Sequence, residues 1–142
     1  MPELVKKEGK IITVRQDKVP REIYPSDKSL YFKTLFDSKH FGTKDMLFGI
    51  AWFEPEGGSC GMHYHDCEEV EYVLSGHGVV AEEDGSEQVM EPGVTIYEPA
   101  GVPHNFINTG DEPLVVVYAH PSANPQTHNI TFDTTWSYKE DF

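Results

Sequence analysis

The sequence predicts an all-β protein, either a sandwich or a barrel. Runs of strand length that are rich in Val, Ile, Tyr, Phe and Thr recur along the chain, a composition typical of strands. The 12 glycines and 10 prolines lie at short intervals between these runs, where they favour turns. Helix signals are weak, and only residues 37–45 suggest a turn or a short helix. A chain of 142 residues can bury one core, so we expect a single domain.

The expected strands divide the chain into three parts. We expect an N-terminal arm (1–45) whose strands join the sheet, a barrel (46–120), and an extension (121–142) that packs on the barrel or on a partner subunit and adds one strand at 130–136. The other expected strands are residues 11–14, 30–36, 46–53, 61–65, 69–74, 78–82, 87–90, 95–98, 104–108 and 114–120. In the strand expected at 46–53, Phe48, Ile50 and Trp52 share a face that we expect to lie mostly in the core.

The charge is unevenly distributed along the chain. The net charge is −13, yet residues 1–44 hold ten Lys and Arg against six Asp and Glu. Residues 45–138 hold sixteen Asp and Glu and no Lys or Arg. Nucleic acids and anionic membranes require clustered Lys and Arg, so neither is an expected partner. We expect a small-molecule ligand that is neutral, zwitterionic, or an anion bonded directly to a metal. A free anionic group would have to be held by the bases of residues 1–44.

The expected compartment is the cytoplasm. The longest strongly apolar run, residues 46–53, is far shorter than a membrane span, and no apolar secretion-signal core follows the first lysines. Cys60 and Cys67 are the only cysteines, which we interpret as free thiols.

Three histidines and one glutamate carry the chemical signal. His63 and His65 are two residues apart, so on a strand both imidazoles point to the same face. Glu69 follows after an expected bend, and His104 comes much later in the chain. Three imidazoles and one carboxylate are a suitable ligand set for a divalent first-row metal. In an octahedral field they leave two positions open for a chelating substrate, or for a substrate and dioxygen.

These residues fall in two motifs that resemble those of the cupin family. The first family motif is G-x5-H-x-H-x3-E-x6-G, and this chain has Gly57, His63, His65, Glu69 and Gly76 at that spacing. The second is G-x5-P-x-G-x2-H-x3-N, which is matched by Gly93, Pro99, Gly101, His104 and Asn108. All ten fixed positions match with both spacings intact.

The resemblance implies a fold and a ligand set. It implies a double-sheet jelly-roll barrel, also called a double-stranded β-helix. It also implies that His63, His65, Glu69 and His104 bind a metal inside the barrel, and that the metal is iron, manganese, nickel, cobalt, copper or zinc. Many cupins are dimers, so we expect a homodimer. Glu68 is a rival to Glu69 by adjacency, but the motif spacing favours Glu69. His40, His77, His120 and His128 match no motif and are not expected to bind metal.

Glu71 is the candidate for proton transfer. If Glu69 points inward, strand alternation points Glu71 inward too, next to the metal. The alternative is a bulge that turns Glu71 to solvent. Some cupin lyases have a tyrosine base at this position, which this chain lacks, while Tyr64 should point away from the metal. Asn108 is expected to hold a loop by hydrogen bonds.

The expected function is that of a metal-dependent enzyme acting on a small oxygenated metabolite. A dioxygenase is narrowly preferred, with Glu71 moving the proton. An isomerase, epimerase or lyase without a redox step is the first alternative. The second alternative is a cupin that binds a small molecule without catalysis.

Overall fold

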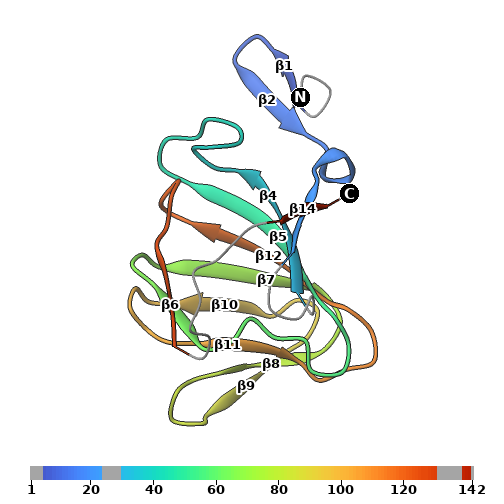
Figure 1. Ribbon diagram of the computed structural model, residues 1–142, viewed down its shortest axis with the longest axis vertical. Coiled ribbons are helices and arrows are strands. Elements are labelled where there is room, and N and C mark those ends of the chain that lie inside the picture. Colours follow the sequence, from blue (N-terminus) through green and yellow to red (C-terminus); the bar gives the residue numbers. More distant parts are fainter. Residues whose placement is uncertain (1–4, 24–29, 131–138, 142) are drawn as a thin grey trace.

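The computed structural model describes residues 5–23, 30–130 and 139–141, and nearly all its elements are strands (Figure 1). One short 3-10 turn, η1 (Gln16–Lys18), is the exception, and residues 37–45 form a loop. The strands are β1 (Val5–Glu8), β2 (Ile11–Val14), β3 (Arg21–Ile23), β4 (Leu30–Phe36), β5 (Leu47–Phe53), β6 (His63–His65), β7 (Glu69–Ser75), β8 (Gly78–Ala81), β9 (Glu87–Met90), β10 (Thr95–Glu98), β11 (Asn105–Asn108), β12 (Leu114–His120), β13 (Thr127–Asn129) and β14 (Lys139–Asp141).

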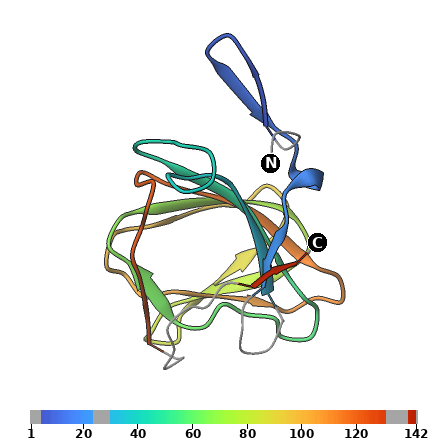
Figure 2. The ribbon, with the colours of Figure 1, turned by 45° about the horizontal axis from the view of Figure 1, so that its top comes forward.

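One large antiparallel sheet forms most of the barrel wall. Its strand order is β10-β7-β12-β5-β4-β3-β14. A three-stranded sheet, β11-β8-β9, and the pair β13-β6 lie opposite, so the strands curve around a common interior (Figure 2). The all-β jelly-roll barrel predicted from the sequence is confirmed.

The core lies between the two walls, and its Phe106 ring lies 5.6 Å from the His104 ring, measured between ring centroids. It includes Phe53, Val73, Met90, Leu114 and Val116, each at most 2 % exposed. The Asn108 side chain donates to the carbonyl oxygens of Phe53 and Glu112, at 2.9 and 2.8 Å. It also accepts the backbone N–H of Gly110. Asn108 therefore holds a turn beside the core, as expected from its place in the motif.

The inner face that strand alternation predicts is correct for β7 but wrong for β5. On β7, Glu69 and Glu71 point inward and are buried, whereas Tyr72 lies outside and is 45 % exposed. On β5, the inner face is formed by Gly49, Ala51 and Phe53, which pair with inward residues of β12. The opposite face lies outward: Phe48 is 38 % exposed and the Trp52 indole stacks on Tyr31 with ring centroids 4.9 Å apart, whereas Ile50 on the same face is buried. Both faces of this central strand are apolar, so periodicity alone could not choose between them.

The regions outside the barrel core differ in how they attach. The hairpin β1-β2 forms its own two-stranded sheet and projects away from the barrel (Figures 1 and 2). β3 and β4 join the large sheet, and β13 pairs with β6. The additional strand expected at 130–136 lies, beyond Ile130, outside the described residues. Among the described residues, no helix has the length and apolar character needed to cross a membrane.

Candidate metal centre

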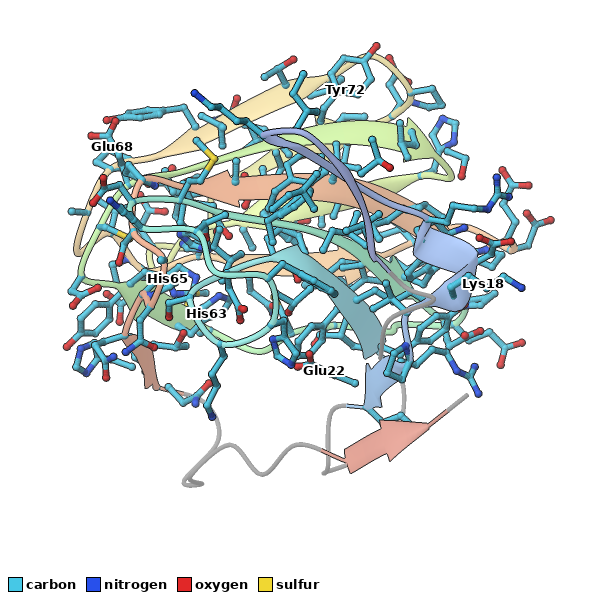
Figure 3. All side chains as sticks on the ribbon, turned by 90° about the horizontal axis from the view of Figure 1, so that it is seen from above. Lys18, Glu22, His63, His65, Glu68 and Tyr72 are labelled. Carbon is cyan, nitrogen blue, oxygen red and sulfur yellow. The ribbon has the colours of Figure 1, made fainter. Side chains whose placement is uncertain are left out.

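Backbone hydrogen bonds bring the motif histidines together. His63 and His65 lie on β6, and His104 directly precedes β11. The N–H of His63 donates to the carbonyl oxygen of His104 at 3.0 Å, and the N–H of His104 donates back to His63 at 2.8 Å. This reciprocal bridge fixes the two sequence motifs beside each other. In Figure 3, His63 and His65 lie within the barrel end, whereas Glu68 and Tyr72 lie at its periphery.

Each of these imidazoles is oriented through its Nδ1 atom. Nδ1 of His63 lies 2.7 Å from the Gly61 carbonyl oxygen, and Nδ1 of His104 lies 3.0 Å from that of Val102. Since a carbonyl oxygen only accepts, both Nδ1 atoms carry the proton. Nδ1 of His65 lies 2.9 Å from the Thr127 hydroxyl. This arrangement leaves the Nε2 lone pairs of His63 and His104 available for a metal, as ligand histidines require.

The donor atoms converge. One ring nitrogen from each of His63, His65 and His104 lies within 4.8 Å of the other two. The Oε1 atom of Glu69 is 3.5 Å from Nε2 of both His65 and His104. Nε2 of His104 is buried and has no hydrogen-bond partner in the part of the chain that the structure describes. Three clustered imidazoles, with a carboxylate beside two of them, fit a divalent first-row ion.

His120 contacts the second oxygen of Glu69. It ends β12, beside Glu69 on β7, and its Nε2 lies 2.6 Å from Glu69 Oε2. The other ring nitrogen, Nδ1, is 3.6 Å from the Cys67 Sγ. A second group of three donor atoms, one each from His65, Glu69 and His120, also lies with all members within 4.8 Å of one another. The sequence does not predict His120 near the candidate metal ligands, because only the pairing of β12 with β7 places it there.

Two further carboxyl groups are buried behind Glu69. Glu71 is 2 % exposed and faces the interior, which excludes the solvent-facing alternative. Glu98 is 4 % exposed and lies opposite Glu69 in the pairing of β10 with β7. The carboxyl oxygens of both have no hydrogen-bond partner within the described ranges. The sequence does not predict Glu98 as a site residue. Strand alternation along residues 95–98 assigns its side chain only to one face of that strand.

Burial and neighbouring charges separate the protonation states of the site. Burial, reinforced by Glu69, raises the pKa of Glu71 well above its usual range. Burial also raises the pKa of Glu98, to about 7. Burial opposes ionisation of Glu69 as well, but contacts with His104, His120 and His65 hold its pKa well below the usual value. The pKa of His63 falls to about 3 because of burial and the neighbouring imidazoles. In the metal-free protein the His63 imidazole is therefore neutral at neutral pH.

A cavity of about 350 Å³ opens beside these residues. Its polar wall includes His63, His65, Glu69, Glu71 and His120. Its apolar wall includes Leu30, Phe32, Phe53, Phe106 and Val116. A concave, mainly apolar space with a few convergent polar groups is typical of small-molecule sites.

A family model of the cupin domain matches residues 50–120. The chain belongs to the cupin family. An uncharacterized protein from Methanocaldococcus jannaschii is 31 % identical over 86 % of this chain and 94 % of its own length. A glucose-6-phosphate isomerase from Thermococcus onnurineus is also 31 % identical over 77 % of this cupin, which spans 58 % of the isomerase's length.

Solved structures similar to this cupin include several enzymes. The polyketide cyclase RemF from Streptomyces resistomycificus has a TM-score of 0.73 and 25 % identity, covering 85 % of this chain and 86 % of the cyclase. A recombinant oxalate oxidase in complex with glycolate has a TM-score of 0.65 and 22 % identity, covering 74 % of this chain and 57 % of the oxidase. The second likeness shows the shared fold.

The remaining sequence candidates lie away from the cluster. Glu68 is exposed, and Tyr64 points away and stacks on His128 at 4.8 Å. His77 is 61 % exposed beside Glu91. His40 also lies away from the cluster but lines the cavity.

Both cysteines of this cupin are thiols that are not joined in a disulfide, as expected. Cys60 lines the cavity, and burial raises the pKa of its thiol to about 12. The pKa of Cys67 is raised as well, by burial and by Asp66, Glu69 and Glu68. Neither thiol has the lowered pKa that marks a reactive cysteine.

Proposed function

We propose that this cupin is a metal-dependent enzyme that transfers protons on a small oxygenated metabolite. His63, His65, Glu69 and His104 would hold the metal, a divalent ion of iron, manganese, nickel, cobalt, copper or zinc. The observation that carries the proposal is that His65 and His104 lie close to both His63 and Glu69, beside a cavity that is lined by His63, His65, Glu69 and the buried Glu71. When bound, such an ion supplies a Lewis acid that polarises a substrate oxygen.

Glu71 is the proposed proton-transfer group. Its carboxyl faces the cavity two residues from the ligand Glu69, on the same face of β7. With a raised pKa it retains a proton that it can donate to a substrate atom, and it can then take one back. Glu98 adds a second buried carboxyl nearby, which disfavours simultaneous ionisation of the two.

The relatives support proton transfer without a redox step. The curated relative of known activity is named an isomerase, and the structural relative at 25 % identity is named a cyclase. The dioxygenase preferred from the sequence is the second candidate. It is favoured by the donor set, since four protein ligands leave room for a substrate and dioxygen. A cupin that binds a small molecule without catalysis is the remaining alternative.

An exchange experiment tests the proposal. The metal-loaded protein, free of oxygen and in D₂O, is given D-xylulose, and proton NMR follows deuterium entering the carbon next to the carbonyl. We expect Glu71→Gln to slow the exchange at least about 100-fold, while the exposed neighbour control Glu68→Gln leaves it unchanged. Full exchange in Glu71→Gln would contradict the role of Glu71. Substrate-dependent oxygen uptake by an iron-loaded protein would favour the dioxygenase.

A homodimer remains part of the proposal. The outer face of β7 and β10 exposes Val70, Tyr72, Leu74 and Tyr97, each at least 44 % exposed. Exposed apolar patches of this kind mark protein contacts. We expect sedimentation equilibrium to give twice the chain mass of 16.1 kDa, and Tyr72→Lys to shift it toward the monomer.

A further inference from the structure

The cavity has a second polar group that no motif explains. The loop between β4 and β5 contributes Asp37, Lys39 and His40 to the cavity lining. Asp37 is 8 % exposed, although it is a charged residue. A buried carboxylate requires a partner, and His40 provides it.

Asp37 fixes the orientation and the tautomer of His40. Its two carboxylate oxygens lie 3.0 and 2.9 Å from the Nδ1 atom of His40. The carbonyl oxygen of Asp37 accepts the backbone N–H groups of Phe41 and Thr43, at 3.3 and 3.1 Å, which holds the loop around the pair. A carboxylate only accepts, so Nδ1 carries the proton. In the neutral ring, Nε2 is then an acceptor, and it makes no hydrogen bond to any described residue.

The register of the large sheet places this pair at the same end of the barrel as the metal ligands. His120 pairs with Leu47, and the neighbouring Ala119 pairs with Val70, next to Glu69. Asp37 directly follows Phe36, which pairs with Phe48 beside Leu47. The pair therefore lies three strands from Glu69, about 14 Å along the curved sheet.

The segment after His120 connects the two groups. The N–H and the hydroxyl of Ser38 both donate to the carbonyl oxygen of Ala123, each at 3.3 Å. Ala123 and the two residues that follow it line the same cavity. One small molecule in this cavity can thus contact the metal ligands at one end and His40 at the other.

We propose that Asp37 and His40 form a hydroxyl-binding group for the end of the substrate that points away from the metal ligands. This inference rests on the proposed function. His40 Nε2 accepts a hydrogen bond from the hydroxyl, and Asp37 holds the ring in the required tautomer. The substrate class is therefore a small molecule with a carbonyl at one end and a hydroxyl at the other.

Charge favours a hydroxyl over an anionic group at this end. Asp37 brings a negative charge beside His40, and Glu22 also lines the cavity. Lys39 is the only Lys or Arg among the lining residues, and it is exposed. A neutral group that donates a hydrogen bond suits these surroundings better than a second carboxylate.

The test uses a pair of probes that differ by one hydroxyl. NMR titration of the metal-loaded protein compares D-xylulose with 5-deoxy-D-xylulose, which lacks only the hydroxyl furthest from the carbonyl. We expect wild-type protein to bind D-xylulose about tenfold more tightly. His40→Phe should abolish this preference while leaving the dissociation constant of the deoxy compound within about twofold. His77→Phe is the matched control and should retain the full preference.

A second measurement is independent of ligand and metal. Long-range ¹H–¹⁵N spectra of the metal-free protein should show His40 protonated at Nδ1. An Nε2–H tautomer, equal binding of the two probes by the wild type, or an unchanged preference in His40→Phe would each overturn the inference. Failure of the proposed function has a different signature, namely D-xylulose binding and exchange that do not depend on the metal or on Glu71.

Discussion

At the residue scale, the contact between His120 and Glu69 is an interaction that the sequence did not predict. Nε2 of His120 donates to Oε2 of Glu69 at 2.6 Å, which leaves Oε1 turned toward His65 and His104. Removing a partner that orients a metal ligand in this way commonly weakens metal affinity about 10- to 100-fold. His120 is thus a positioning residue for Glu69.

Substitutions that keep or remove one nitrogen test this role. We expect His120→Leu to weaken Co²⁺ affinity about 10- to 100-fold. His120→Gln keeps an N–H near the position of Nε2 and should restore most of the affinity, with an unchanged Co²⁺ absorption spectrum. A spectrum altered in His120→Gln would instead make His120 a direct ligand. Competition titration with a chelator measures both affinities.

A second residue-scale prediction concerns Glu98 in the metal-free protein. Its pKa is raised from 4.5 to about 7, so the folded protein binds this proton more tightly than the unfolded chain does. The resulting stability is fully present below pH 4.5 and is lost as the pH rises through 7. Glu98→Gln removes this dependence. Its free energy of unfolding relative to wild type should rise by up to about 3 kcal/mol between pH 4.5 and 7.5.

Urea unfolding of both proteins at several pH values measures this difference. A difference that stays constant across the range would show that Glu98 does not titrate in the folded protein.

At the element scale, β5 shows what a strand pattern determines. Its bounds were predicted within one residue, yet its inner face was assigned incorrectly. The inner face includes Gly49, where a Cβ atom would collide with the Tyr118 ring on β12. The sequence shows a glycine there but not the tyrosine opposite, because the pairing of β5 with β12 is set by the tertiary fold.

A double-mutant cycle tests the packing of β5 against β12. We expect Gly49→Ala to lower the free energy of unfolding by about 1–3 kcal/mol, since the added methyl group overpacks the site. In a Tyr118→Ala background the cost should largely disappear, because the colliding ring is gone. Equal costs in both backgrounds, measured by urea unfolding, would show that the ring does not cause the strain.

Strand pairings cannot be seen in the sequence, and this explains which parts of the site could be predicted. His63, His65, Glu69 and His104 are recognisable because their spacing forms two local motifs. Glu71 follows from alternation on the same strand as Glu69. His120, Glu98 and the Asp37–His40 pair belong to no local pattern. Strand pairings and a loop contact between distant parts of the chain bring His120 and the Asp37–His40 pair to the cavity and Glu98 opposite Glu69.

At the scale of the whole molecule, the charge distribution agrees with the proposed metal. Residues 45–138 contain sixteen acidic residues and no Lys or Arg, and they supply all four proposed ligands. A bound divalent cation would be the main positive charge in this part of the chain, and the acidic surroundings favour it. The residues before position 45 contribute Lys39 to the cavity, where the sequence had suggested that a base-rich segment could act.

The central claim is that one divalent ion is held by His63, His65, Glu69 and His104. Its most direct test is the metal content of protein purified without chelators, measured by mass spectrometry. We expect about one ion per chain in the wild type and in the control His128→Ala, whose ring stacks on Tyr64. His63→Ala and His104→Ala should each lose it. Unchanged metal content in these two folded variants would contradict the assignment.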